Sequence, residues 1–258
     1  MSERRFRRIL RRMNYITDQT GIYTRYSREA DNWAEHLKNT KAYISGYLSK
    51  HDFRSVSILG SGWLLDLPSS LFTGIFDRVI LYDVNHPEQV KQKLKGNSNC
   101  RLVSADITGG LIESVYNAVL IYKKSKRKTE IADLKFAGFK PVEETDCYIS
   151  LNILNQLDIL VADYLKPKKI YSADELKKIR SVIQGDHLRS LPKNKSCLIT
   201  DIREMICRKA GLPETSRNLL FTDLPDGRNI QKWNWIFDTT GSYNTGCKTT
   251  FEVIAMEF

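Results

Sequence analysis

The chain has no long hydrophobic run. No apolar stretch among its 258 residues approaches the about 18 residues that a membrane-spanning helix needs. Its first residues are rich in arginine, where a secretory signal would place an apolar segment. The composition, 41% hydrophobic and 27% charged, is that of an ordinary globular domain. Together these features predict a cytoplasmic protein.

Close pairs of metal-binding residues are also missing. The cysteines include no C-x-x-C pair, and the four histidines show no H-E-x-x-H spacing. Structural zinc and disulfide frameworks both depend on such regular spacings. We therefore expect no metal site, and buried reduced thiols at most of the cysteines, which are Cys100, Cys147, Cys197, Cys207 and Cys247.

A third glycine is absent from the segment GSGWLLDLP (60–68), which follows an apolar run. The dinucleotide pattern G-x-G-x-x-G uses its last glycine for close packing of helix on strand, and Leu65 occupies that position. Pro68 suits the first turn of a helix, so the helix is expected to start later than a bound pyrophosphate requires. A wider loop results, which suits a cofactor without phosphate. An NAD-dependent oxidoreductase remains a less favoured alternative.

Two apolar runs of the sequence end in small or acidic residues that suit a ligand site. The run VSIL ends in Gly60-Ser61-Gly62, and RVILY (78–82) ends in Asp83, 23 residues after Gly60. Glycines let a backbone approach a ligand closely, and an acidic residue about 20 residues on bonds ribose hydroxyls. The spacing indicates a site for an adenosine-containing cofactor.

The net charge of +10 lies in two short tracts. Residues 1–12 and 123–128 carry the excess, and the rest of the chain is balanced. In the first tract Phe6, Ile9, Leu10 and Met13 recur with helical spacing, which predicts an amphipathic helix. We expect its apolar stripe to dock on the protein; contact of the two basic arms with nucleic acid is the alternative.

Apolar segments alternate with helical ones along most of the chain, which predicts a parallel sheet with helical crossovers. Residues 1–50 are expected to form an N-terminal helical annex, with a second helix capped by Ser27 and running to about Lys50. Residues 51–258 are expected to form the main domain, with an inserted surface segment at 123–144. Strands are expected at 55–60, 78–83, 100–105, 147–154, 196–200, 232–237 and 250–258, the last two as a hairpin, and helices after Pro68 and near 87–95, 111–122 and 173–184.

The order of several short segments resembles the class I, Rossmann-like S-adenosylmethionine-dependent methyltransferase superfamily, and a bacterial branch of it in particular. These segments are GSGWLLDLP, YDVNH, ADITG, SLNILNQL, DHLRSL, LITD and WNW. The resemblance covers roughly residues 50–258. It implies a three-layer α/β sandwich with a mostly parallel seven-stranded sheet that ends in an antiparallel hairpin. It also implies methyl transfer from S-adenosylmethionine.

The same resemblance assigns residues to parts of the cofactor. Gly60 and Gly62 would approach its methionine and ribose portions, and Asp83 would accept hydrogen bonds from both ribose hydroxyls. Asp106 would lie beside the adenine amino group. The remaining members of the cofactor set are Ser61, Val84, Ile107 against the adenine ring, Asn152 where donor and acceptor meet, and Asp66 near the α-amino group.

Local structure offers an alternative role for each of these polar residues. Aspartate favours helix N-caps and turns, so Asp66 could cap a helix and Asp106 could form a turn. Amides at 152, 155 and 156 could likewise serve as turn and cap residues. For Trp233 and Trp235, packing is the favoured role.

Methyl transfer from a sulfonium has a neutral leaving group, so a catalytic acid is not required. If the acceptor must lose a proton, the candidate bases, in descending preference, are His187, Asp201, His36 and Tyr26. No Asn-Pro-Pro-Tyr motif follows the fourth expected strand, which excludes the pattern of amino-methylating DNA enzymes. We expect the N-terminal annex to select the acceptor, with a small molecule favoured. A non-catalytic nucleotide- or RNA-associated module is the alternative function.

Overall fold

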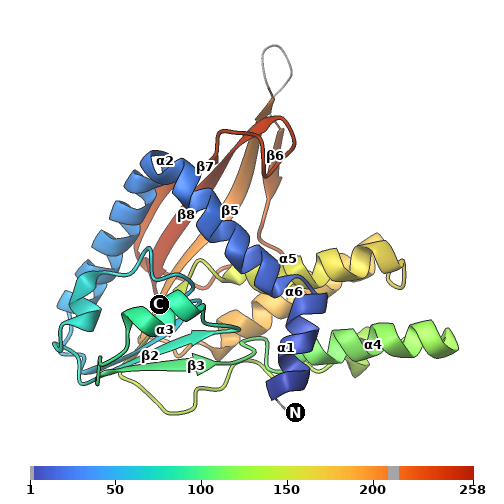
Figure 1. Ribbon diagram of the computed structural model, residues 1–258, viewed down its shortest axis with the longest axis horizontal. Helices are drawn as coiled ribbons and strands as arrows, with labels where there is room; N and C mark the ends of the chain where they lie inside the picture. Colours follow the sequence, from blue (N-terminus) through green and yellow to red (C-terminus); the bar gives the residue numbers. More distant parts are fainter. Residues whose placement is uncertain (1–2, 209–214) are drawn as a thin grey trace.

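The computed structural model describes residues 3–208 and 215–258 and is built around one mixed β-sheet (Figure 1). Its main path runs in the order β3-β2-β1-β4-β5-β8-β7, and a short strand, β6, pairs with β5. The strands from β3 to β5 are parallel, whereas β8 pairs antiparallel with both β5 and β7. The prediction of a mostly parallel sheet ending in an antiparallel hairpin is therefore confirmed. The strand bounds are β1 Ser55–Leu59, β2 Arg78–Asp83, β3 Cys100–Ser104, β4 Cys147–Leu151, β5 Ser196–Arg208, β6 Thr215–Asn218, β7 Arg228–Asp238 and β8 Cys247–Glu257.

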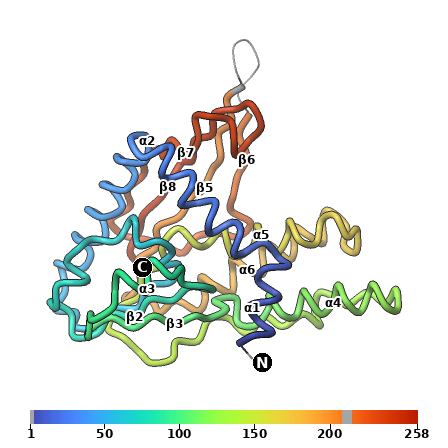
Figure 2. The backbone as a smooth tube through the Cα atoms, viewed as in Figure 1, coloured from blue at the N-terminus to red at the C-terminus, as the bar shows by residue number. Residues whose placement is uncertain are grey.

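Helices cover both faces of the sheet, as Figures 1 and 2 show. On one face α4 (Leu111–Ser125), α5 (Leu154–Leu165) and α6 (Ala173–Ser190) pack on side chains such as Leu59 and Ile80. On the other face the second half of α2 (Tyr15–Ser49) and α3 (Glu88–Lys93) pack on side chains such as Ile58 and Leu81. The central strands β1 and β4 are buried along their whole length, which explains why they are continuous apolar runs. The layers are those of a three-layer α/β sandwich.

The first helix, α1 (Glu3–Arg12), docks by its apolar stripe as predicted. Ile9, Leu10 and Met13 are buried against the core that contains α4, while most arginines of the helix stay exposed. At its end Asn14 adopts a left-handed conformation, with φ 66°, which separates α1 from α2.

The prediction of a helix start at Ser27 is wrong. The helix α2 begins at Tyr15 and continues past Ser27, whose hydroxyl donates to the carbonyl of Tyr23. Nothing between the two positions stops a helix, because the one glycine there, Gly21, costs only about 1 kcal/mol. The helix is interrupted two residues after Ser27, at Glu29, where φ is −110° and ψ is 19°. The buried carboxylate of Glu29 accepts hydrogen bonds from the backbone and hydroxyl of Thr239, which follows β7.

Other boundaries differ from expectation where the backbone turns. The strand expected over 147–154 ends at Leu151, because Asn152 is left-handed with φ 48° and α5 starts at Leu154. The helix expected after Pro68 is a single 3-10 turn, η1 (Ser69–Phe72). The strand expected over 196–200 continues to Arg208. Another 3-10 turn, η3 (Lys166–Lys168), follows α5.

The segment after α4 is attached to the core. It contains one 3-10 turn, η2 (Ile131–Asp133), and it buries Leu134 and Phe139 against the face that carries α4 and α6. Phe139 meets the ring of Tyr82 edge-on, with ring centroids 4.9 Å apart. Although its sequence is highly charged, apolar contacts therefore hold this segment in place.

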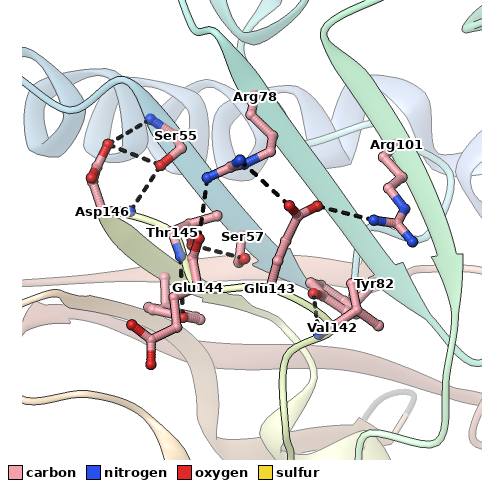
Figure 3. Close-up of polar contacts among 11 residues, drawn as sticks. Ser55, Ser57, Arg78, Tyr82, Arg101, Val142, Glu143, Glu144, Thr145 and Asp146 are labelled. Atoms are coloured by element: carbon pink, nitrogen blue, oxygen red, sulfur yellow. Dashed lines mark hydrogen bonds and ion pairs between the residues drawn. The ribbon is translucent and has the colours of Figure 1, made fainter.

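Polar contacts fix the last residues of this segment across the first three strands (Figure 3). One carboxylate oxygen of Asp146 accepts from the backbone N–H groups of Arg54 and Ser55 and from the Ser55 hydroxyl, at 2.8 to 2.9 Å. Glu143 forms ion pairs with Arg78 of β2 and Arg101 of β3. These contacts hold the start of β4 beside the start of β1.

We expect Asp146→Ala to lower the free energy of unfolding by about 1–2 kcal/mol, because a charged acceptor of three hydrogen bonds is lost at an exposed site. Urea unfolding at neutral pH measures this. Glu144→Ala is the matched control: that side chain is exposed and only its backbone carbonyl is bonded, to Arg78, so a change within about 0.5 kcal/mol is expected.

The effect should depend on pH in a defined direction. Hydrogen bonds from Arg54 N–H and the Ser55 hydroxyl hold the pKa of Asp146 below its ordinary value. Its contribution to stability is therefore complete above the unfolded-state pKa of about 4 and disappears as the pH falls through the folded-state value. The difference between wild type and Asp146→Ala should shrink in acid; a constant difference would contradict this account.

Candidate functional site

A large cavity opens at the carboxyl ends of the parallel strands and is covered by α2. It encloses about 1030 Å³ of non-atom space, its open mouth included. Its wall contains the residues that directly follow β1, β2, β3 and β4, together with one face of α2 and the start of α5. Open α/β sheets bind their ligands at this edge. The cavity is therefore the candidate functional site.

Every residue that the sequence assigned to the cofactor lies in the wall of this one cavity. They come from four strand ends, far apart in the sequence, and they are Gly60, Ser61, Gly62, Asp66, Asp83, Val84, Asp106, Ile107 and Asn152. The parallel strand order brings these ends to one edge of the sheet, so the convergence follows from the fold.

The two glycines of the loop are required for different reasons. Gly60 has φ 87°, and a Cβ there would lie 2.6 Å from the carbonyl oxygen of Leu151 and 2.8 Å from the Cβ of Ile153. Gly62 has φ 47°, but a Cβ there would have open space. At Gly60, packing against the end of β4 excludes a side chain; at Gly62 only the backbone conformation favours glycine.

Asp83 is buried at the end of β2 and bonds to the glycine loop. Its Oδ2 accepts from the Gly62 N–H at 2.8 Å, and its Oδ1 accepts from the Gln19 amide at 3.3 Å. Burial raises the pKa of Asp83, and neighbouring His86 and the Gly62 N–H offset part of this rise. The glycine loop and Gln19 thus hold the Asp83 side chain in the cavity wall.

Gln19 is a site residue that the sequence analysis missed. Its side-chain amide donates to the backbone carbonyl of Asn85 and accepts from the Asn85 side chain, both at 2.7 Å. The backbone carbonyl of Gln19 accepts from the Trp63 indole, also at 2.7 Å. These bonds attach α2 to the ends of β1 and β2. The only local signal is that Tyr15, Gln19 and Ile22 recur with helical spacing on the face that lines the cavity.

Asp106 lines the cavity, but its carboxylate is also used within the protein. One oxygen accepts from the backbone and hydroxyl of Thr108, and the other accepts from the N–H groups of Gly110 and Ile112 at the start of α4. Burial raises the pKa of Asp106, and the bonds from Thr108 partly offset this. The turn that the sequence offered as an alternative is present.

Asp66 and Asn152 meet across the cavity. The side-chain N–H of Asn152 donates to Asp66 at 2.9 Å, while the side-chain oxygen of Asn152, Oδ1, is buried without a hydrogen-bond partner. Burial raises the pKa of Asp66 to about 6. The hydroxyls of Ser61 and Tyr15, also in the wall, are buried without a partner too. These unsatisfied groups fit a cavity that binds a polar ligand.

The charges of the wall are all of one sign. Its ionisable side chains include the carboxylates of Asp18, Asp66, Asp83 and Asp106, and the described residues that line it include no lysine or arginine. Such a wall attracts cations and repels phosphates and other anions.

Of the four candidate bases, the cavity wall contains only His36. His187 is buried on the other face of the sheet, where its Nε2 bonds to the Ser150 hydroxyl at 2.7 Å. Asp201 lies within β5 and is outside the wall, and burial raises its pKa to about 7. Tyr26 packs against Trp33, with ring centroids 5.8 Å apart, behind the wall.

His36 is neutral, and its proton is on the ring nitrogen that does not bond to Trp233. Burial lowers its pKa to about 3. Its Nδ1 accepts from the Trp233 indole at 3.1 Å, so the single proton of the neutral ring is on Nε2. The ring stacks on Trp235 at 4.0 Å with an interplanar angle of 7°. Both tryptophans of the hairpin therefore take part in packing, as expected, and Trp235 also lines the cavity.

The remaining amides that were singled out have different surroundings. Gln156 is exposed and lines the cavity, whereas the buried Asn155 donates to the carbonyl of Asp201 at 2.6 Å. Among residues 3–208 and 215–258, no group of three His, Cys, Asp or Glu side chains is placed to hold a metal ion. No helix in that part of the chain is long and apolar enough to cross a membrane.

Some basic side chains of the two tracts bond to other parts of the protein. Arg5 pairs with Glu113 and Arg12 bonds to the Tyr116 hydroxyl, which fixes α1 on α4, and Lys128 pairs with Glu175 of α6. The other basic side chains of the two tracts are exposed; they are Arg4, Arg7, Arg8, Arg11, Lys123, Lys124, Lys126 and Arg127.

No family model and no curated protein matches this chain. Among solved structures it is similar to the N-methyltransferase NodS from Bradyrhizobium japonicum, in complex with S-adenosylhomocysteine, at 10% identity over 85% of this chain and 86% of that one, with a TM-score of 0.38. It is also similar to 1,6-didemethyltoxoflavin-N1-methyltransferase from Burkholderia thailandensis, at 10% identity over 100% and 92% of the two chains, with a TM-score of 0.39. These values are low, so the fold assignment rests on the strand order and layers of this chain.

We expect Gly60→Ala to lower the free energy of unfolding by about 3 kcal/mol, because a left-handed alanine costs about 1–2 kcal/mol and overpacking adds about 1–3. Gly62→Ala should cost only about 1–2 kcal/mol, because its Cβ has space. Urea unfolding of the two variants measures the difference. Equal losses would show that the contact with Leu151 does not constrain the loop.

Proposed function

We propose that this protein transfers a methyl group from S-adenosylmethionine to a small-molecule acceptor. The observation that carries the proposal is the cavity wall: residues of the methyltransferase pattern converge there, and its charges are carboxylates without lysine or arginine. A cationic sulfonium fits such a wall. The pyrophosphate of NAD or the backbone of a nucleic acid does not.

Each part of the cofactor has a group in the wall that suits it. Asp83 suits the ribose hydroxyls, and the half-buried Asp66 suits the α-amino group, because both are acceptors at the edge of the glycine loop. Ile107 and Ile112 offer an apolar surface for the adenine ring, beside the unpartnered hydroxyl of Tyr15. The Asp106 carboxylate already accepts four hydrogen bonds within its own turn. We therefore infer that this turn shapes the adenine end of the cavity and that Asp106 does not bind the adenine amino group.

In the reaction, a lone pair on the acceptor attacks the methyl carbon while the electrons of the carbon–sulfur bond move to sulfur. The sulfonium becomes a neutral thioether, and an acceptor that carried a proton loses it to solvent. Holding the two reactants in line can supply about 7–11 kcal/mol of the barrier. His36 is a poor base here, since its Nδ1 is occupied and burial lowers its pKa to about 3. Positioning is therefore the main catalytic contribution of this chain.

We propose the cytoplasm as the location of this activity. The exposed arginines of α1 support nucleic-acid contact as an alternative partner, and salt-dependent RNA binding that is lost when they are replaced would favour it.

Calorimetric titration tests the cofactor directly. We expect S-adenosylmethionine and S-adenosylhomocysteine to bind and NAD to be silent. Asp83→Ala should weaken binding roughly ten- to a hundredfold, since a hydrogen bond to a charged group contributes about 1.5–3 kcal/mol. Asp77→Ala is the control. Asp77 precedes β2 at the end opposite to Asp83, is exposed and pairs with Arg54, so its loss should leave the affinity unchanged. Silence from all three ligands would refute the proposal.

The role of Asp66 gives a pH dependence. A carboxylate binds an ammonium group only when it is ionised, so affinity for S-adenosylhomocysteine should rise as the pH increases through about 6, the pKa of Asp66. Asp66→Asn should remove most of this rise. If the variant keeps the full pH dependence, another group holds the amino end.

A further inference from the structure

One part of the cavity wall is aromatic and contains none of the residues assigned to the cofactor. We call it the aromatic compartment: Trp33, His36 and Leu37 of α2 and Trp235 of β7. In the sheet, β7 is separated from β1 by β4, β5 and β8. The helix α2 lies against β7 and spans both ends (Figure 1). The compartment is therefore placed for a second ligand.

The compartment contains an indole N–H without a partner. The chain has four tryptophans, and three of their N–H groups donate within the protein. Trp33 donates to the carbonyl of Phe237 at 2.9 Å, Trp63 to that of Gln19 at 2.7 Å, and Trp233 to His36 at 3.1 Å. The Nε1 of Trp235 is buried with no partner, in a side chain that is 7% exposed. A buried donor left unpaired is destabilising, and a ligand with an acceptor atom would satisfy it.

The second polar group of the compartment is also a donor. Because the Nδ1 of His36 accepts from Trp233, its proton is on Nε2. An indole N–H donates only. The compartment thus combines aromatic surfaces with two N–H donors, and no lysine or arginine lies in the described wall to neutralise an anion.

These features exclude several classes of acceptor. An amine or other donor finds no acceptor among the four side chains of the compartment, and a carboxylate or phosphate finds four aspartates in the same cavity. A flat ring fits beside stacked aromatic side chains, and a ring nitrogen or carbonyl oxygen satisfies Trp235.

We propose, on the basis of the proposed methyl transfer, that the acceptor is an uncharged aromatic heterocycle that accepts a hydrogen bond from the Nε1 of Trp235. This bond orients the ring, and a second nucleophilic atom of the ring system faces the methyl group. The aromatic compartment, and not the cofactor end, then determines which acceptor is used.

The test uses quinoline, a bicyclic ring with one acceptor nitrogen, at a pH where it is neutral. Indole has the reverse polarity, and 1-naphthoate is the anionic counterpart. In the protein saturated with S-adenosylhomocysteine, the four indole N–H signals are followed by ¹⁵N-correlated NMR and assigned with Trp→Phe variants. We expect quinoline to shift the Trp235 signal most strongly, and indole and 1-naphthoate to bind about tenfold more weakly or not at all.

A variant tests the same contact. Trp235→Phe should weaken quinoline binding about three- to tenfold and leave the affinity for S-adenosylhomocysteine unchanged. Tyr243→Phe is the control, since that ring packs on the neighbouring Phe237 and lies outside the cavity wall. If Trp235→Phe does not fold, the NMR titration of the unaltered protein still decides.

Several results would overturn the proposal: no binding of quinoline, a shift confined to other tryptophans, or equal binding of indole. An equal loss of S-adenosylhomocysteine affinity in Trp235→Phe would also overturn it, because the compartment would then belong to the cofactor. Failure of S-adenosylhomocysteine to bind refutes the proposed function instead. In that case a quinoline shift at Trp235 in the ligand-free protein would still support the compartment as a heterocycle site.

Discussion

The hydrogen bond from the Gly62 N–H to the Asp83 carboxylate is the contact on which the site depends. It joins the loop after β1 to the end of β2 at 2.8 Å, inside a region with little solvent. Gln19 bonds to the same carboxylate and to Asn85, and its carbonyl holds Trp63. A single buried charge therefore connects two strands of the sheet to the helix that covers them. Because burial makes an isolated carboxylate costly, these donors also stabilise the charge itself.

The sequence allowed the central fold to be predicted because its signals are local. Apolar runs such as 56–59 and 147–151 are buried on both faces, and the end of each such strand is marked by a glycine, aspartate or asparagine. Once the strands are parallel, their carboxyl ends must share an edge. The convergence of Gly60, Asp83 and Asn152 on one cavity needed no further information.

Other features depend on contacts between distant segments, and no local pattern reveals them. The bonds between Gln19 and Asn85 join α2 to the end of β2. Trp235 lines the cavity only because β7 returns beside α2. The helix α5 was missed because its first residue was assigned to the strand expected over 147–154, which in fact ends before the left-handed Asn152. In the same way, the interruption of α2 at Glu29 is stabilised by Thr239, more than 200 residues away along the chain.

Net charge and site charge are opposite in this molecule. The chain carries +10 overall, yet the ionisable groups that line the cavity are carboxylates and a neutral histidine. Most positive side chains of α1 are exposed and have no partner among the residues that the structure describes, and several others pair with acids on the surface. The charge of the cavity wall, and not the net charge of the chain, therefore indicates the charge of the ligand.

The placement of the tryptophans has a practical consequence. Trp33, Trp63 and Trp235 line the cavity, and Trp233 is one hydrogen bond away through His36. Since these are all four tryptophans of the chain, its tryptophan fluorescence comes from this one part of the molecule. Tryptophan emission, excited selectively, is a local reporter of the cavity and of the contact between α2 and β7, and it carries little information on the opposite edge of the sheet at β3.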